Sequence, residues 1–358
     1  PMTSATISDV YRRELVRHAM KTGFYNPNDL SNLDFLCHDF SMRGMSSLET
    51  TITSGMAHLT SFCGSESVPA IKMIEYYYKA DPKKELIAAT VPATEHSVEC
   101  SNATNDSGIP DDEIYFKRML DEFPDGIISI VADGYDYWKF LTKIVPKYKD
   151  QIMSRNGRVV IRPDSGDPVK IICGDPEADD QFVKMGSYEF LWNTFGGTFN
   201  KKGYKVLDTH IGLLYGDSIN MKRQRMIYAQ LEDKMFAATN LILGIGSFSF
   251  QMNTRDQLAF ACKATWCSVN GKSIEIFKDP KTVTGTPKKS HRGLIMVVKD
   301  ENGNYKPIDR VSIEDEASDK NELKTVFEDG KLVKEFTLAE IRKTRQDAVH
   351  KLLDGTID

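Results

Sequence analysis

The sequence predicts an α/β fold in which helices surround a parallel sheet. Short β-rich apolar runs alternate with segments of helical periodicity, at a spacing of roughly 30 to 50 residues that is typical of parallel βαβ units. The predicted strands are apolar almost throughout, as burial on both faces of a sheet requires. A barrel and a doubly wound sheet both satisfy this pattern.

Each predicted element has a local reason. A capping box at residues 46–49 precedes apolar residues at helical spacing, which predicts a helix from Leu48. Apolar runs that stop at charged or glycine-rich residues predict strands at Leu86–Val91, Gly126–Val131, Arg158–Ile161, His210–Tyr215 and Asn240–Ile245. Apolar residues at helical spacing predict further helices at Val68–Ala80, Ile114–Phe123, Tyr137–Val145, Asp180–Phe195 and Asn220–Met235.

The pattern changes after about residue 268. The turn signals Asn302-Gly303 and Asp329-Gly330 lie between short alternating runs, which predicts β-hairpins. A capping box at residues 337–340 begins a last helix. We therefore predict a catalytic α/β domain over residues 1–268 and, over residues 269–358, a hairpin region with a closing helix that packs back on it.

The composition is that of a globular chain, with 41% hydrophobic and 27% charged residues. Because 46 basic and 51 acidic residues leave a net charge of −5, no overall basic field favours nucleic acid as a partner. No apolar run approaches the roughly 20 residues of a membrane helix, so no membrane partner is expected. Six scattered cysteines without a C-x-x-C pair favour a reducing compartment, and we expect the cytoplasm.

Polar side chains follow the predicted strands where each strand ends, which is where parallel folds collect functional groups. The carboxylates of Asp133, Asp164 and Asp217 could converge there on a hydroxylated ligand or on Mg²⁺, or each could be a helix N-cap. Arg162 could bind a phosphate through its planar fork. His96 could act as an acid, base or nucleophile, or be a structural residue.

Other residues could add to an anion site. Arg43 precedes the helix predicted from Leu48, and the free N–H groups at the start of that helix suit a phosphate. An arginine on a surface turn is an equally good interpretation of Arg43. Gly246 and Ser247 follow a strand in a weak glycine motif that is also typical of a structural turn. The remaining cations, which could equally be solvated surface, are Arg255, Lys263 and Lys288.

Taken together, these motifs resemble those of the nicotinamide phosphoribosyltransferase family. They occur in the family's order, and the resemblance runs from Pro1 to about Leu352. The matching segments are His38–Gly44, Val91–Ser97, Asp133–Asp136, Ile161–Gly166, Gly216–Asp217, Thr254–Asp256 and Phe277–Pro280. Many ordered motifs along one chain carry more weight than any single one.

The resemblance implies an irregular parallel α/β barrel of the type II phosphoribosyltransferase kind over residues 1–268, working as a homodimer with shared active sites. In the family, nicotinamide and 5-phosphoribosyl 1-diphosphate give nicotinamide mononucleotide and diphosphate for NAD salvage. Mg²⁺ accompanies the diphosphate, and ATP assists through a phosphohistidine. A longer family region precedes the equivalent of Pro1 and lends an aromatic residue to the partner subunit's pocket, and we expect this chain to lack it.

Carried over by position, the resemblance assigns a role to each candidate. Phe40 is expected to stack on the pyridine ring and Arg43 to contact the carboxamide and phosphate region. His96 is the expected phosphorylated residue, and Asp133 beside it and Asp164 are the other catalytic residues and the expected Mg²⁺ ligands, directly or through water. Ser129 is expected to line the pocket, and Arg162 and Asp164 to hold the diphosphate and ribose. Asp217 is expected to bind the ribose hydroxyls, and Gly246 and Ser247 the 5′-phosphate. The residues expected to bind other phosphate oxygens are Arg255, Lys263 and Lys288.

Three positions depart from the family pattern. Glu66 stands where the family usually has an aspartate that accepts the nicotinamide amide, so the charge is kept and a methylene is added. The glycine run is reduced to residues 246–248, and Gly212 replaces an arginine. Nicotinate specificity is one alternative, which Glu66 disfavours because two carboxylates repel each other. A catalytically incomplete nucleotide-binding or dimerisation module is the other.

Overall fold

The computed structural model describes residues 2–24, 26, 29–103, 110–253, 257–258, 263–277, 291–353 and 355. The chain divides into two compact units, the first over residues 1–253 and 337–355 and the second over residues 254–336 and 356–358. The predicted boundary after residue 268 falls inside the second unit, and the last helix is grouped with the first unit.

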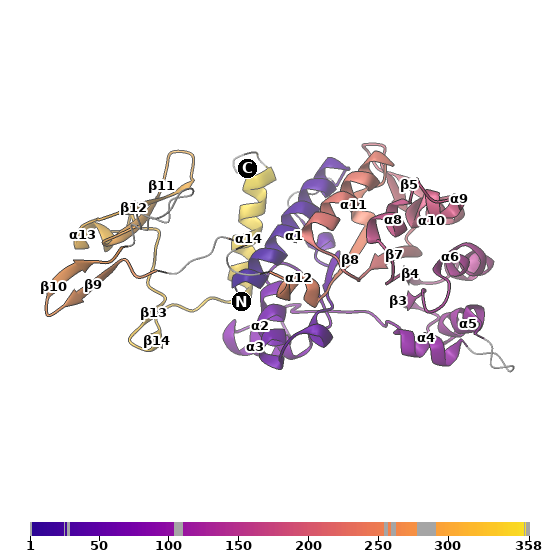
Figure 1. The fold of residues 1–358 in the computed structure, drawn as a ribbon, viewed down its shortest axis with the longest axis horizontal. Coiled ribbons are helices and arrows are strands. Elements are labelled where there is room, and N and C mark those ends of the chain that lie inside the picture. The colour runs from indigo at the N-terminus through magenta and orange to yellow at the C-terminus, as the bar shows by residue number, and fades with distance from the viewer. Residues whose placement is uncertain are drawn as a thin grey trace. The chain divides into compact units, whose positions relative to one another are not determined.

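The first unit is built on a parallel sheet of six strands in the order β2-β1-β8-β7-β4-β3 (Figure 1). These strands are β1 (Cys37–Asp39), β2 (Gly64–Ser65), β3 (Gly126–Val131), β4 (Gly157–Arg162), β7 (Ile211–Tyr215) and β8 (Leu241–Ile245). Both edges of the sheet meet one extended segment, in which Ala89 bridges to Gly64 and Ala93 bridges to Ser129. The predicted irregular parallel α/β barrel is thereby confirmed.

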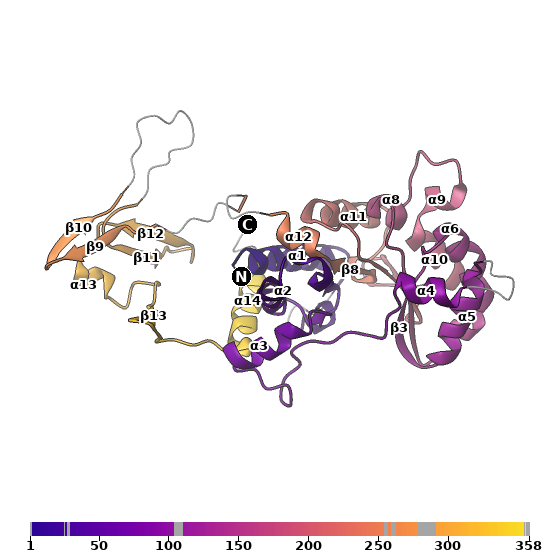
Figure 2. The same ribbon diagram turned by 60° about the horizontal axis from the view of Figure 1, so that its bottom comes forward.

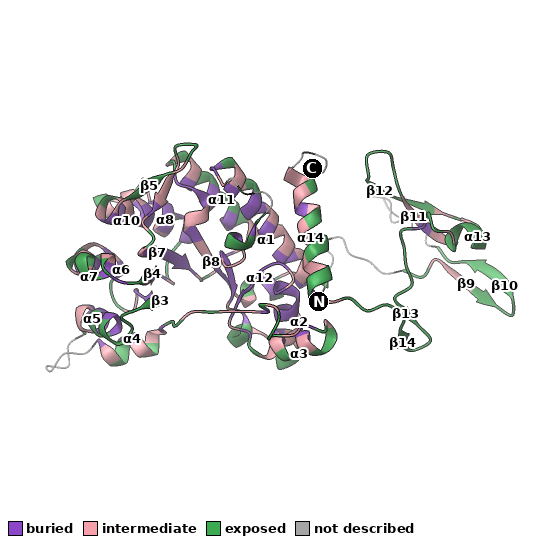
Figure 3. Cartoon of the chain, turned by 180° about the vertical axis from the view of Figure 1, so that it is seen from behind, coloured by how far each residue is buried: buried purple, intermediate pink, exposed green. Residues whose placement is uncertain are grey.

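Helices wrap the curled sheet (Figures 1 and 2). They are α1 (Met2–Lys21), α2 (Leu48–His58), α3 (Pro69–Tyr77), α4 (His96–Asn102), α5 (Asp112–Glu122), α6 (Tyr137–Lys139), α7 (Lys149–Met153), α8 (Pro168–Cys173), α9 (Gln181–Met185), α10 (Ser187–Phe195), α11 (Met221–Asp233), α12 (Ser247–Gln251) and α14 (Leu338–Leu353). Figure 3 shows the buried residues along the sheet and on the helix faces turned toward it. Among the described helices, none combines the length and the apolar character needed to cross a membrane.

Several predicted elements need correction. The helix predicted over residues 180–195 is two helices, because the chain turns at Gly186, whose φ is 83°. The strand predicted over residues 86–91 is an extended segment joined to its neighbours by single bridges. The capping box of α2 is formed by Ser47 and Thr50 instead of Ser46 and Glu49.

The second unit contains small antiparallel hairpins, as predicted. They are formed by β9 (Trp266–Val269) with β10 (Lys272–Glu275), β11 (Ile295–Lys299) with β12 (Tyr305–Asp309), and β13 (Phe327–Glu328) with β14 (Lys331–Leu332). The turn at Asp329-Gly330 has φ values of 47° and 80°, as a two-residue hairpin turn requires. A short helix, α13 (Ile313–Glu316), follows β12. In the first unit, β5 (Gly197–Phe199) and β6 (Lys205–Leu207) form another hairpin.

The last helix, α14, packs into the first unit through its amino-terminal end. Thr337 and Glu340 form the predicted capping box, with hydrogen bonds of 2.7 and 3.2 Å between backbone N–H groups and side chains. Leu338 is fully buried in an apolar cluster with residues of α2 and α3 and of the segment that follows them. Arg342 donates hydrogen bonds to the carbonyls of Leu59, Leu86 and Ile87 at 2.7 to 3.0 Å. The last helix thus belongs to the apolar core that α2 and α3 form in the first unit.

Replacing Leu338 by alanine is expected to lower the free energy of unfolding by about 3 kcal/mol, because a fully buried leucine would leave a cavity in this cluster. Urea unfolding followed by circular dichroism measures the change. Leu48→Ala is the matched control, since Leu48 is 58% exposed in the same unit and should change stability little. Equal losses in the two variants would contradict the assignment of α14 to the core.

Candidate active site

The carboxyl ends of the strands meet at one mouth of the barrel, where a cavity of about 470 Å³ opens. Loops that follow five of the strands line this cavity, as expected for parallel strands whose ends lie together. The predicted site residues among its walls are Phe40, Arg43, Glu66, Arg162, Asp164, Asp217, Gly246 and Ser247. The structure therefore gathers most of the predicted site residues at one cavity.

A second cavity of about 830 Å³ lies inside the barrel and shares Phe40 and Glu66 with the mouth. Ser129 lines this inner cavity and is 2% exposed, and its hydroxyl has no hydrogen-bond partner among the described residues. The aliphatic walls include Val91, Ala93, Val160, Leu214 and Ile242. Arg155, Arg158 and His210 line this cavity where the strands begin. Phe40 and Glu66 thus stand where a charged mouth meets a largely apolar interior.

Phe40 is seated against the backbone of two neighbouring strands. A β-carbon added to Gly244 would lie 2.4 Å from the Phe40 ring, and one added to Gly216 would lie 3.2 Å from it. At the next turn, a β-carbon on Gly44 would lie 2.2 Å from the hydroxyl oxygen of Ser247. Only glycine fits at positions 244 and 44, because the Phe40 ring and the Ser247 side chain lie too close to the backbone there for any side chain.

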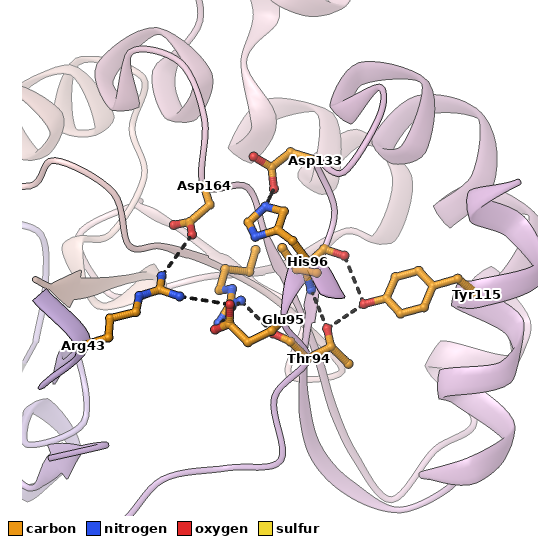
Figure 4. Close-up of polar contacts among 9 residues, drawn as sticks. Arg43, Thr94, Glu95, His96, Tyr115, Asp133 and Asp164 are labelled. Atoms are coloured by element: carbon orange, nitrogen blue, oxygen red, sulfur yellow. Dashed lines mark hydrogen bonds and ion pairs between the residues drawn. The ribbon is translucent and has the colours of Figure 1, made fainter. Parts of the chain in front are cut away.

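Two arginines share one carboxylate at the mouth (Figure 4). Glu95 contacts Arg43 Nη1 at 3.1 Å and Arg162 Nη2 at 3.3 Å, and Arg43 Nη2 lies 4.0 Å from Asp164. Partial burial favours the neutral acid, but the charges of Arg162 and Arg43 outweigh it and hold the pKa of Glu95 below its usual value. Arg162 is 3% exposed, and its Nε has no hydrogen-bond partner among the described residues. The buried guanidinium can therefore accept a further anionic ligand.

The segment that carries Glu95 is fastened to β3. Thr94 N donates to the Ser129 carbonyl at 3.0 Å, and Val131 N donates to the Thr94 hydroxyl at 2.9 Å. The hydroxyls of Thr94 and Tyr115 lie 2.5 Å apart (Figure 4), and Arg162 Nη2 donates to the Thr94 carbonyl at 2.7 Å. These bonds fix the backbone one residue before Glu95, so its carboxylate and the following histidine are held in place.

His96 begins α4 and faces Asp133, which follows β3. Its Nε2 lies 3.2 Å from Asp133 Oδ1 (Figure 4). The imidazole is 42% exposed, whereas the carboxylate is 3% exposed. A buried carboxylate that holds one nitrogen of an accessible imidazole orients the ring and leaves the other nitrogen for chemistry.

One turn after His96, Glu99 is fully buried behind this pair. Its carboxyl group packs on Gly134, where any side chain would collide with it. Burial, reinforced by the charges of Asp112 and Asp133, raises the pKa of Glu99 to about 8. Glu99 is therefore largely a neutral acid near pH 7, beside the carboxylate that holds His96.

Stability is expected to fall as pH rises through the range set by Glu99. The unfolded chain releases the proton near pH 4.5, whereas the folded chain keeps it to about pH 8, so the folded state binds more protons between these values. Glu99→Gln should remove this dependence, and its advantage in urea midpoint over the natural chain should grow from pH 5 to pH 9. Asp121→Asn, which changes an exposed carboxylate of neighbouring α5, is the control. A constant gap between Glu99→Gln and the natural chain would contradict the prediction. The titrations are made in EDTA.

Carboxylates also accumulate on the other side of the mouth. Burial raises the pKa of Asp164, and although Arg162 opposes this effect, the charges of Asp133 and Asp217 add to it. Negative charge gathered in this way favours a divalent cation. Among the described residues, no three His, Cys, Asp or Glu side chains form a metal cluster. Two carboxylates fit Mg²⁺, since this ion is usually bound by one or two carboxylates, water and substrate phosphates.

The structure does not test the roles predicted for the remaining cations. Arg255 and Lys288 lie outside the described residues. Lys263 is exposed in the second unit, at the start of the described stretch 263–277. Their expected phosphate contacts stay predictions.

Glu95, Thr94 and Tyr115 were not predicted as site residues. The sequence does give a reason to consider Glu95 and Thr94, because they directly precede His96 at the end of an extended segment. No sequence pattern indicates Tyr115, since it lies in the middle of α5 and reaches Thr94 only in the folded chain.

A curled parallel barrel with arginines and strand-end carboxylates at its mouth defines an α/β-barrel enzyme that handles an anionic, hydroxylated substrate. The model of the nicotinate phosphoribosyltransferase (NAPRTase) family matches residues 35–331. The chain therefore belongs to the nicotinate phosphoribosyltransferase family. This confirms the prediction of a phosphoribosyltransferase, an enzyme of the pentosyltransferase class.

Curated relatives agree with this assignment. The chain is 45% identical to nicotinamide phosphoribosyltransferase of Acinetobacter baylyi over 99% of its own length and 68% of the relative's. It is 34% identical to the protein of that name from Mycoplasma pneumoniae over 78% of this chain and 57% of the relative. A third relative of that name, from Xanthomonas campestris, is 31% identical over 96% of this chain and 68% of the relative. The chain thus spans between 57% and 68% of the length of these relatives.

Proposed function

We propose that the protein joins nicotinamide to 5-phosphoribosyl 1-diphosphate, releasing diphosphate and forming nicotinamide mononucleotide for NAD salvage. The observation that carries the proposal is the junction at Phe40 and Glu66, where a mouth with two arginines opens into an apolar cavity. A phosphorylated sugar suits the mouth, and a flat heteroaromatic ring suits the junction. The names of the relatives support the same base.

In this reaction the pyridine nitrogen bonds to ribose C1 as the bond from C1 to the diphosphate oxygen breaks. The diphosphate leaves with the electron pair, and the ribose carries positive charge in the transition state. Arg43 and Arg162 would hold the leaving diphosphate, while Asp164 and Asp217 would orient the ribose hydroxyls and stabilise the developing cation. Asp133 and Asp164 would hold Mg²⁺, which when bound neutralises diphosphate charge.

ATP would assist through His96. The contact with Asp133 holds Nε2 and leaves Nδ1 as the nucleophile for the γ-phosphorus of ATP. The bond from this phosphorus to the bridging oxygen breaks, and ADP leaves with the electron pair. The Nε2 proton then lies between a cationic ring and the Asp133 carboxylate, which stabilises the phosphorylated histidine. A homodimer with shared active sites, located in the cytoplasm, completes the proposed picture.

Glu66 supports nicotinamide over nicotinate. Burial raises the pKa of Glu66, while Arg162 and Arg43 oppose this rise. As a carboxylate, Glu66 would accept an N–H of the nicotinamide amide, whereas the nicotinate carboxylate would be repelled.

The test supplies both bases in equal amounts with phosphoribosyl diphosphate, ATP and Mg²⁺, and measures the products by mass spectrometry. Nicotinamide mononucleotide is expected to predominate, and Glu66→Gln should lower the ratio of nicotinamide mononucleotide to nicotinate mononucleotide. Predominant nicotinate mononucleotide would establish the alternative specificity. If neither product forms while diphosphate still binds, the chain is a catalytically incomplete binding module.

A further inference from the structure

A second charged cavity lies away from the mouth of the barrel, at the amino ends of β1 and β2. It has a volume of about 140 Å³ and is lined by Arg12 of α1 and by Arg342 and Arg345 of α14. Figures 1 and 2 show these helices side by side. Asp34 and Cys63, which also line it, precede β1 and β2, so this cavity and the catalytic mouth lie at opposite ends of the strands.

Several buried donors at this cavity lack partners. Arg12 is 1% exposed and uses Nη2 in a 2.6 Å contact with Asp34, but its Nε and Nη1 make no hydrogen bond within the described residues. Arg345 donates through Nε to the Thr60 carbonyl at 3.1 Å, and its buried Nη1 is likewise unpaired there. The buried hydroxyl of Ser61, another lining residue, also lacks a partner in the described chain. A buried donor left unpaired destabilises the fold, so a ligand that accepts hydrogen bonds from these donors would stabilise it.

The cavity is also positively charged. Three guanidinium groups face the carboxylates of Asp29 and Asp34, which leaves an excess of one positive charge. Burial, reinforced by the charge of Arg12, lowers the pKa of Arg345 to about 10, although Asp34 and Asp9 oppose this. Arg342 already gives its donors to backbone carbonyls, so Arg12 and Arg345 are the groups that can turn to a ligand.

We propose that this cavity, formed where α1 and α14 meet, binds a tetrahedral inorganic oxyanion, with inorganic phosphate as its ligand. Acceptor oxygens would take the unpaired N–H groups of Arg12 and Arg345 and the hydroxyl of Ser61, and the anion would neutralise the excess charge. At roughly 30 Å³ for each water, the cavity holds about five waters, which suits one such ion and excludes a nucleoside. The site is independent of the proposed reaction.

The test separates this site from the mouth of the barrel. Arg162→Gln serves as the background because it weakens phosphate binding at the mouth, and labelled inorganic phosphate is titrated by equilibrium dialysis. One bound phosphate per chain is expected, and adding Arg345→Gln should weaken its affinity at least tenfold, whereas Arg345→Lys should weaken it less. Equal binding with and without Arg345→Gln would overturn the proposal, as would no binding in a folded Arg162→Gln chain.

Thermal unfolding and crystallography supply independent readings. On the Arg162→Gln background and in phosphate-free buffer, Arg345→Gln should unfold at a temperature no lower than the chain that keeps Arg345, because it relieves repulsion from Arg12. Added phosphate should then raise the unfolding temperature of the chain that keeps Arg345 more than that of Arg345→Gln. If Arg345 had only a structural role, Arg345→Gln would lower the unfolding temperature in the absence of phosphate and would leave the stabilisation by added phosphate unchanged. Crystals soaked in selenate should show an anomalous peak between Arg12 and Arg345, and water alone at that place would contradict the proposal.

Discussion

Replacing His96 by asparagine is expected to abolish phosphorylation of the protein by ATP and to reduce turnover to the rate seen without ATP. Asparagine can keep a polar contact with Asp133 but has no nucleophilic ring nitrogen. The loss should be at least tenfold in kcat at saturating ATP, with little change in the KM for nicotinamide. Acid-labile phosphate on the protein and mononucleotide formation with and without ATP measure the two effects.

His210→Asn is the matched control. His210 also lies beside an aspartate, with Nδ1 2.6 Å from Asp208. It precedes β7 and lines the inner cavity at the opposite end of the strands from His96. This variant should keep both the phosphorylation and the ATP response. If His96→Asn is still phosphorylated on histidine, the nucleophile is another residue and the proposed role of His96 is wrong.

Replacing Arg162 by glutamine is expected to give the largest loss of substrate binding. Its guanidinium is almost fully buried between the Thr94 carbonyl and Glu95, so glutamine leaves Glu95 with one cation fewer and the diphosphate without its fork. We expect kcat/KM for phosphoribosyl diphosphate to fall by about 100-fold, the scale of losing one preorganised donor to developing charge. Arg162→Lys should recover only part of this loss, since an ammonium group has no planar fork.

Arg158→Gln, on the same strand, controls for the loss of a charge. Arg158 lies at the amino end of β4, where it lines the far end of the inner cavity and donates to the Thr209 carbonyl, and it does not line the mouth that is proposed to bind the diphosphate. Steady-state kinetics and isothermal titration with diphosphate measure both variants, and circular dichroism verifies that they fold. Equal losses at Arg158 and Arg162 would show that the effect is general and not local to the mouth.

The long apolar runs were predictable because their physical reason is local. Strands β3 and β4 carry six residues each and pair over their full length, so their apolar character is visible in the chain. Strands β1 and β2 have three and two residues and include polar side chains, so no run marks them. Helix α1 was missed because its buried face includes Ser8, Arg12 and Glu14, which interrupt the apolar stripe.

The site was predictable to the extent that it follows from strand ends. Asp164 and Asp217 follow β4 and β7, and parallel strands bring such positions to one edge. The contact of Glu95 with Arg43 joins residues 52 positions apart and depends on how the extended segment bridges the barrel. Likewise, the burial of Glu99 against Gly134 depends on packing that no local pattern records.

The contact of Glu95 with both arginines affects which anions the mouth selects. Its carboxylate serves as a built-in counter-ion, so any anion that takes Arg43 and Arg162 has to displace it. An anion with one negative charge gains little binding energy by displacing Glu95 from the arginines. A multiply charged anion that binds an arginine through two oxygens gains enough to displace the carboxylate. Because Glu95 directly precedes His96, an anion that displaces this carboxylate takes up a charge contact one residue away from the histidine. A diphosphate that displaces Glu95 would thus change the charge next to His96, the residue proposed to receive phosphate from ATP.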